Sequence, residues 1–526
     1  MKRILLATAS LLGLAQVLSS CDKEYLDETP KSLYTPQTVL TDSLGFEAAM
    51  AGLQSVVREQ YTHSDQQGLI SIMQLGTDVA MPGQVQGVEV PYYNYNQLTA
   101  QDRGSEIFWS WAYRTINNAN QIIDGAATAP STVRQGYKNR ISAEARFFRA
   151  YAYNFLATLW GDVPLVDKPV TSPRTDFTRT PVADINAFII NDLTTAIPSM
   201  LPGNRVISGR ISRGAAQQLL GEVYLRDNKP ALAEQVLRDL INSNVYQLIR
   251  ARYGVKSSQP GDYFSDMFIV GNQRRSQGNT ELIWGIEQQL LIPGGTTSAQ
   301  QRRVWVPAYY NVPGMALADS LGGRGLARLR LSNWVDYRLY NSGPDMRNSK
   351  YNLKRKFYYN DASRPATFGK PVTGLKGSDT IFYITPYTTK WNQFDPTDTF
   401  GFGTIKDLPM MRLGETYLLL AEAQFKQGKL ADAATSINVL RTRAQAAQVT
   451  ASQIDLNFIL DERARELIGE EQRRITLVRT GTLIERATRL NGAFVTGLTQ
   501  KNLLLPIPQA ERDRNISANL SQNPGY

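Results

Sequence analysis

The chain has 526 residues, of which 42% are hydrophobic and 20% charged, and these proportions exclude a disordered or low-complexity protein. Its single cysteine and single histidine exclude an internal disulfide and most zinc sites. The net charge is +10, but basic and acidic residues are interspersed along the sequence, so it has no long basic stripe of the kind that binds nucleic acid.

A short apolar segment at the start of the chain has the pattern of a secretory signal. Lys2 and Arg3 precede an uncharged run over residues 4–18, which is too short to span a membrane as a helix. The run ends in Leu18-Ser19-Ser20-Cys21, which resembles a bacterial lipobox. We therefore expect residues 1–20 to be removed and Cys21 to carry the lipid; an ordinary signal peptide with a chance cysteine is the alternative.

Helical periodicity dominates the rest of the sequence, mostly in pairs of helices. Two hairpins far apart in the chain share the spacing of tetratricopeptide repeats, with small residues where helices cross and Gly or Pro at the turn. Because so much sequence separates them, we predict an insertion between the two repeats. The predicted helices are 105–125 and 137–160, 184–197, the hairpin 212–226 with 231–243, and the hairpin 411–427 with 430–443.

The predicted insertion differs in composition from the helical blocks. It is rich in Gly, Pro, Asn, Ser and Tyr and contains short apolar runs such as 282–286 and 381–384, which favour short strands between long loops. The fold class is thus mainly α, with about four tetratricopeptide-like helix pairs and one irregular insertion. The predicted divisions are a signal peptide at 1–20, an N-terminal helical region at 21–245, a ligand-binding insertion at 246–408, and a C-terminal region at 409–526.

Several segments resemble one family of outer-membrane lipoproteins. The run from Asp407 to Ala423 looks like the signature of the SusD/RagB family, and four further segments agree with it in order along the chain. Any one of these motifs is weak, but together with the lipobox they span the sequence from end to end. The four segments are Trp160 to Leu165, Gly209 to Ala216, Asp345 to Arg347, and Leu505 to Tyr526, the last resembling the family's terminal strand and tail.

The resemblance implies a lipid-anchored protein of the outer membrane, exposed on the cell surface. Such a protein captures oligosaccharides and delivers them to a SusC-like TonB-dependent transporter, with binding and gating but no chemical step and no cofactor. Capture of oligopeptides, as in RagB-like members, is the alternative within the family. A secreted glycosidase is a second alternative, from another class of protein.

Three regularly spaced glutamates are candidates for either a catalytic or a structural role. Glu462, Glu466 and Glu470 recur at i, i+4 and i+8, so they lie on one helical face and could in principle serve glycoside hydrolysis. Arginines three or four residues away favour a helical ion network instead. The sequence has no nucleophile elbow and no phosphate-binding loop, and the Gly322–Gly325 run is interpreted as a mobile surface turn. We therefore predict no catalytic residues and no metal site.

Aromatic residues divide by their surroundings. Those in helical or strand patterns, such as Trp109, Trp111, Trp160 and Trp284, are predicted to be core. Those in Gly-, Pro- and Asn-rich loops are candidates for stacking on a pyranose, with packing of the loops onto the repeats as an equal alternative. We expect residues 66–101 and the insertion to build one binding face. The candidate ligand-binding residues are Tyr92, Tyr93, Tyr95, Trp305, Tyr309, Tyr310 and Asn311.

Overall fold

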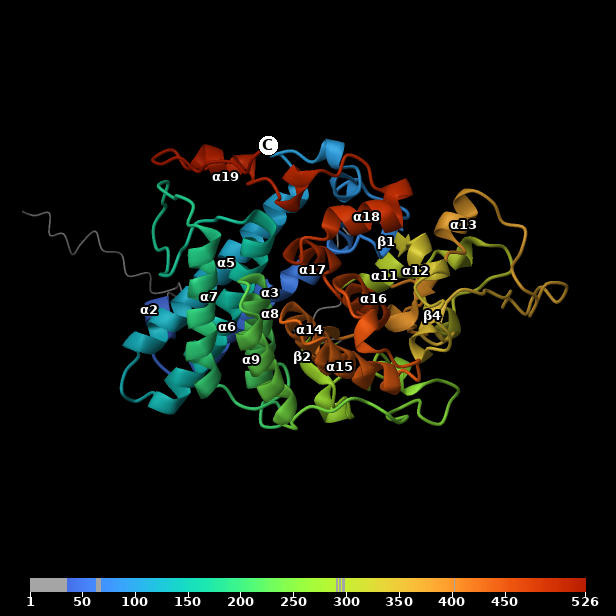
Figure 1. Cartoon of the computed structure of the whole chain (residues 1–526), viewed down its shortest axis with the longest axis horizontal. Coiled ribbons are helices and arrows are strands. Elements are labelled where there is room, and N and C mark those ends of the chain that lie inside the picture. Colours follow the sequence, from blue (N-terminus) through green and yellow to red (C-terminus); the bar gives the residue numbers. More distant parts are fainter. Residues whose placement is uncertain (1–35, 63–67, 290–291, 293–294, 296–298, 402) are drawn as a thin grey trace, which may run out of the picture.

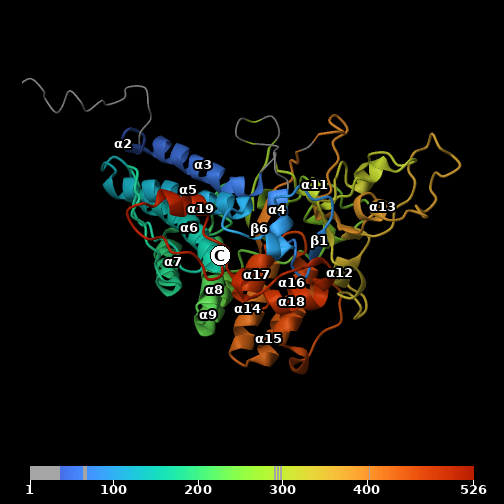
Figure 2. The same ribbon diagram turned by 90° about the horizontal axis from the view of Figure 1, so that it is seen from above.

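The computed structural model describes residues 36–62, 68–289, 292, 295, 299–401 and 403–526 (Figure 1). Cys21, the predicted lipidation site, lies outside the described residues. A stack of helices forms one side of the molecule and the loop-rich insertion forms the other, with the C-terminal helices between them (Figure 1, Figure 2). Across these described residues, every helix is too short or too polar to cross a membrane.

The stack begins with four long helices. Aromatic residues of α5 and α6 pack between the two helices, and the ring centroids of Trp109 and Trp160 are 5.6 Å apart. The Asp102 carboxylate caps α5 by accepting a hydrogen bond from the Ser105 backbone N–H (2.7 Å). The predicted core tryptophans, including Trp284, are buried. These helices are α3 (Ser43–Arg58), α5 (Arg103–Thr128), α6 (Gln135–Trp160) and α7 (Val182–Ala196).

The two predicted hairpins form α8 (Arg213–Arg226) with α9 (Pro230–Asn242), and α14 (Leu413–Lys426) with α15 (Leu430–Arg443). Helices α9 and α14 pack against each other. Gly221 lets the helices of the first hairpin approach closely, since a Cβ there would lie 2.7 Å from the Leu237 side chain. The two hairpins therefore lie side by side, although the long insertion separates them in the sequence. The shared cluster contains Leu225, Ala233, Leu237, Leu419, Leu420 and Ala423.

Short antiparallel strand pairs organise the insertion. Strand β2 (Leu282–Ile286) pairs with β6 (Leu408–Arg412), and β4 (Leu353–Lys354) pairs with β5 (Tyr387–Thr388). The prediction of a strand at 381–384 is wrong, because helix α13 (Ser378–Phe382) covers the first two of these residues and a turn follows it. Its last turn closes locally, where the Tyr383 N–H donates to the Asp379 carbonyl (3.1 Å).

The C-terminal segment returns across the whole fold. Residues 505–508, which resemble the family's terminal strand, form no strand and instead lie against the end of α6, where the Trp160 indole N–H donates to the Pro506 carbonyl (2.8 Å). The Asn523 amide then donates to the Trp160 carbonyl (3.0 Å), so the tail closes over the same helix end. The C-terminal helices are α16 (Leu456–Leu467), α17 (Arg473–Arg479), α18 (Leu483–Asn491) and α19 (Gln509–Arg514). Other short helices are α2 (Pro36–Val39), α4 (Gly68–Ser71), α10 (Tyr263–Asp266), α11 (Gln301–Trp305) and α12 (Asn333–Tyr337).

Candidate functional site

Two loop segments far apart in sequence meet through a short strand pair. Strand β1 (Ala80–Pro82) pairs antiparallel with β3 (Leu329–Leu331). The pairing continues beyond the strands, because the backbone N–H groups of Gly83 and Gln84 donate to the carbonyls of Arg328 (3.1 Å) and Ala327 (2.7 Å). The described part of the first segment, residues 68–101, is thus joined to the insertion, as expected for a common face.

Tyr92 and Tyr95 do not lie on that face. Both side chains are fully buried and lie against the guanidinium of Arg474, which donates to the Tyr95 hydroxyl (2.6 Å) and to the Tyr92 carbonyl (2.9 Å). The Tyr92 hydroxyl donates to Asp102 (2.6 Å), and burial raises the pKa of Tyr92 well above its usual value. The prediction that these two rings contact ligand is corrected: they tie the loop to the core.

Trp305 and Tyr309 are also core residues. Trp305 ends helix α11 and is 2% exposed within an apolar cluster that includes Leu75 and Leu329. Tyr309 is fully buried, and its hydroxyl accepts a hydrogen bond from the Ala318 backbone N–H (3.1 Å). The prediction that these two rings contact ligand on an exposed face is therefore wrong, because the loop folds inward onto β3 and the rest of the insertion.

Three of the predicted residues remain accessible. Tyr310 is half-buried, with its ring edge-on to Tyr309 (centroids 5.9 Å apart) and its hydroxyl donating to the Gly325 carbonyl (3.2 Å). Asn311 is exposed, and Tyr93 is half-buried against the cluster that contains Trp305. Of the aromatic pair at 309 and 310, only Tyr310 presents part of its ring to solvent.

Guanidinium groups that sequence reasoning missed lie beside Tyr310. The Arg324 guanidinium lies 5.6 Å from the ring centre of Phe400, a residue that is 63% exposed. Arg328 donates to the Gln84 carbonyl (2.9 Å) and so bridges the two loop segments. Burial, with Arg324 and Arg328 nearby, lowers the pKa of Arg303 to about 10. We call the surface formed by Gln84, Tyr310, Asn311, Arg324, Arg328 and Phe400 the loop junction.

Arg324 lies in the Gly-rich run at 322–325, which is interpreted from the sequence as a mobile surface turn. That interpretation is wrong, because Gly322, Gly323 and Gly325 are buried and the turn is packed. A Cβ on Gly323, whose φ is +76°, would lie 2.1 Å from the Gln393 carbonyl oxygen. The glycines therefore allow a close approach of two backbones that holds Arg324 at the surface.

Aspartates of the insertion, which could in principle serve as carboxylates for glycoside hydrolysis, have structural partners. The carboxylates of Asp266, Asp319 and Asp336 pair with Arg252, Lys256 and Arg355, each at 2.6 Å. Asp262 caps α10 by accepting from the Ser265 backbone N–H (2.7 Å).

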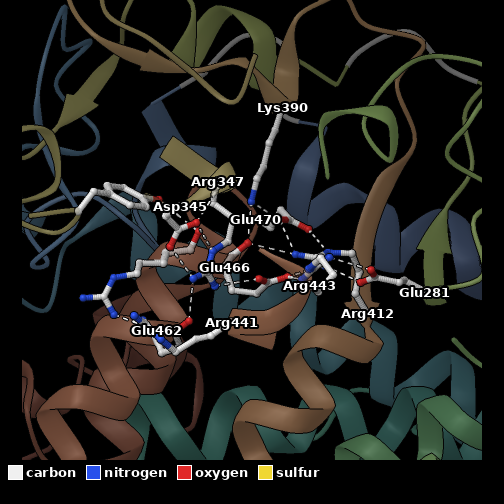
Figure 3. Close-up of polar contacts among 12 residues, drawn as sticks. Glu281, Asp345, Arg347, Lys390, Arg412, Arg441, Arg443, Glu462, Glu466 and Glu470 are labelled. Atoms are coloured by element: carbon white, nitrogen blue, oxygen red, sulfur yellow. Dashed lines mark hydrogen bonds and ion pairs between the residues drawn. The ribbon is translucent and has the colours of Figure 1, made fainter. Parts of the chain in front are cut away.

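The prediction of an ion network around Glu462, Glu466 and Glu470 is confirmed, but most of its partners come from other elements (Figure 3). Glu466 has no exposed surface, and its carboxylate contacts Arg347 (3.2 Å), Arg412 (3.1 Å) and Arg443. Burial raises the pKa of Glu462, but Arg347, Arg465 and Arg441 outweigh it and lower that pKa to about 2. Glu462 therefore stays charged, and the network ties distant segments of the fold together.

The family-like motifs contribute to this same network. Arg347 belongs to the Asp345–Arg347 segment, and Arg412 belongs to the long signature after Asp407. A Cβ on Gly414 would lie 2.7 Å from a carboxylate oxygen of Glu466, so the signature glycine makes room for the network. The motifs therefore specify the buried framework and not the loop junction.

A polar cavity of about 120 Å³ lies between the helical stack and the C-terminal helices. Tyr61, Tyr151 and Trp305 line it, together with Glu415. This volume lies below the range of small-molecule sites, about 300–1,000 Å³. Trp305 thus faces an internal space and not a glycan-sized cleft.

Comparisons with known proteins agree with this architecture. A protein-family model described as the SusD family matches residues 329–526, and another described as starch-binding associating with outer membrane matches residues 24–225. The starch-binding protein SusD of Bacteroides thetaiotaomicron is 39% identical over 429 residues, covering 74% of this chain and 73% of that protein. The SusD-like protein P25 of Formosa agariphila is 26% identical, with 94% of each chain covered. The chain belongs to the SusD family.

Solved structures of low sequence identity share the fold. A laminarin-binding SusD-like protein superposes with a TM-score of 0.69 at 23% identity, covering 92% of this chain and all of that one. Surface glycan-binding protein A from Bacteroides thetaiotaomicron, solved with laminarihexaose, gives a TM-score of 0.71 at 18% identity, with the same coverage. Both support the mainly α SusD-like fold predicted from the sequence.

Proposed function

We propose that this protein is a cell-surface glycan-binding lipoprotein that captures oligosaccharides and delivers them to a SusC-like TonB-dependent transporter of the outer membrane. Membership of the SusD family supports this function, and the relatives named for starch and laminarin support a glycan as the ligand. The lipobox-like segment ending at Cys21 supports the anchor. The protein acts by binding, without a chemical step.

The loop junction is the proposed binding surface, and its combination of groups is the observation that carries the proposal. Tyr310 and Phe400 offer aromatic faces to the apolar C–H face of a sugar, while Arg324 and Arg328 offer N–H donors to its hydroxyls. Strand pairing between β1 and β3 fixes the loops that carry these groups. The arrangement suits a ligand rich in hydroxyls.

Substitution at the loop junction tests this site. Each aromatic stacking contact contributes roughly 0.5–1.5 kcal/mol, and a hydrogen bond from a charged group contributes about 1.5–3 kcal/mol. The Tyr310→Ala, Arg324→Ala double variant should therefore weaken oligosaccharide binding at least about tenfold in isothermal titration. Tyr337→Ala, on α12 and 69% exposed, is the matched control and should bind as the wild type does. Unchanged affinity in the double variant would place the glycan elsewhere.

A further inference from the structure

A groove outside the loop junction lies against the helical stack. It has a volume of about 330 Å³ and is formed by α5, the connector after α6, and the C-terminal segment that contains α19. That volume lies within the range of small-molecule sites, about 300–1,000 Å³. The C-terminal segment approaches α5 in both views (Figure 1, Figure 2).

Aromatic rings form the walls of this groove. Trp109 and Tyr113 come from α5, with ring centroids 5.0 Å apart, and Phe177 comes from the connector. Hydrogen bonds hold the walls in place: the Tyr113 hydroxyl donates to the Pro164 carbonyl (2.8 Å), and the Asn515 side chain bonds both the N–H and the carbonyl of Phe177 (2.8 Å each). The groove is therefore a built feature of the fold, with little freedom to collapse.

Polar groups in the groove keep unused hydrogen-bonding capacity. Trp109 is 3% exposed, and its indole N–H has no acceptor in the described part of the chain. Asn118 is half-buried, and among the described residues its side-chain amide also has no partner. The side-chain oxygen of Asn117 accepts a hydrogen bond from the Val170 N–H (2.9 Å), so the N–H donors of the same amide can bind a ligand. The indole N–H is open to solvent in the groove, so a group that enters the groove can replace water as its acceptor.

We propose that this groove is a second carbohydrate subsite, which takes one pyranose ring of a glycan. The proposal rests on the proposed function and extends it to a second site on the same chain. A pyranose matches both features of the groove, since its C–H face stacks on an aromatic ring while its hydroxyls pair with the indole and amide groups. A purely apolar side chain would leave those donors unpaired and buried, which is costly.

Indole resonances give a direct test, because the protein has only seven tryptophans. Full-length protein would be labelled with ¹⁵N and titrated with maltohexaose and with laminarihexaose, and the Trp109 indole peak would be assigned with Trp109→Phe. The peak should shift with at least one of these glycans. It should still shift in the Tyr310→Ala, Arg324→Ala variant, because the groove binds independently of the loop junction.

A variant that fills the groove separates binding there from indirect effects. Ser110 is exposed and lines the groove, so Ser110→Arg should abolish the Trp109 shift without disturbing the core. Gln121→Ala, on the same helix and outside the groove, should keep the shift. A Trp109 peak that does not move while the glycan binds at the loop junction would overturn the second subsite and leave the proposed function standing. A shift that survives Ser110→Arg would also overturn it, and binding of neither glycan at either place would overturn both proposals.

Discussion

Glu466 illustrates how a single buried carboxylate can hold distant segments together. Its arginine partners come from three places: the segment before β4, the end of β6, and the end of α15. Removing one member of such a network leaves the other charges buried without compensation, a loss that typically costs about 3–5 kcal/mol.

Substitution of this residue tests the network. Glu466→Leu should lower the free energy of unfolding by about 3–5 kcal/mol in urea denaturation, because three arginines lose their shared partner. Glu485→Ala is the matched control: Glu485 is half exposed, and among the described residues its one ion pair is with Arg489 on the same helix, so the loss should stay below about 1 kcal/mol. Equal losses in the two variants would contradict a stabilising role for the buried network.

The buried carboxyl group of Glu415 predicts that the stability of the protein depends on pH. Burial is the main cause that raises its pKa to about 7; Arg463, whose guanidinium lies 2.7 Å away, lowers it, and Glu222 and Glu471 raise it further. In the unfolded chain the carboxyl loses its proton near pH 4.5. Between pH 4.5 and 7 the folded state thus binds more protons than the unfolded state, so stability should fall as the pH rises, by at most about 1.4 kcal/mol per pH unit.

The measurement compares urea unfolding at several pH values for the wild type and Glu415→Gln. The variant should lack the part of the slope that falls between pH 4.5 and 7. Glu462 has a pKa near 2 in the folded state and 4.5 as its usual value, so the stability it contributes is lost only as the pH falls below 4.5. It therefore does not obscure the effect of Glu415 between pH 4.5 and 7. Identical slopes in the two proteins would show that Glu415 titrates normally.

At the scale of elements, close helix crossings explain why small residues recur at fixed spacing in the hairpins. Ala421 on α14 is fully buried in a cluster with Ala433, Ala434 and Ile437 of α15. Ala421→Trp should therefore overpack the crossing and destabilise the protein by at least about 1–3 kcal/mol. Ala431→Trp, exposed on the same hairpin, is the control and should leave the melting temperature nearly unchanged. Similar melting temperatures for both variants would mean that the crossing is loosely packed.

The helical elements could be predicted because their signals are local. Hairpins α8–α9 and α14–α15 show apolar periodicity, small crossing residues and Gly or Pro at the turn, all within about 30 residues. The direction of loop side chains has no such signal. Trp305 and Tyr309 point inward because β3 and the rest of the insertion supply apolar partners from distant sequence. A Tyr- and Trp-rich loop therefore does not show which of its rings face solvent.

The members of the loop junction could also be predicted only in part, because chain folding and not local sequence brings them together. Tyr310 and Asn311 were predicted from composition, whereas Arg324, Arg328 and Phe400 were missed because they join the surface only through chain folding. The Gly-rich turn around Arg324 was a usable signal, since three glycines around one arginine indicate a tightly packed backbone.

At the scale of the whole molecule, the proposed lipid anchor would determine where the protein works. If Cys21 carries the lipid, Cys21→Ser should abolish labelling by an acyl-chain probe and release the protein from the outer-membrane fraction. The variant should retain the wild-type circular dichroism spectrum, because Cys21 precedes the first described helix. Unchanged labelling and fractionation would contradict the lipoprotein assignment.

Glycan capture is the central claim, and one binding measurement tests it most directly. Isothermal titration of the purified protein lacking residues 1–21 against a panel of oligosaccharides and oligopeptides would show which class of ligand it recognises. The account predicts measurable affinity for at least one oligosaccharide and none for the peptides. Binding of peptides with no affinity for any glycan in the panel would contradict it and favour oligopeptide uptake.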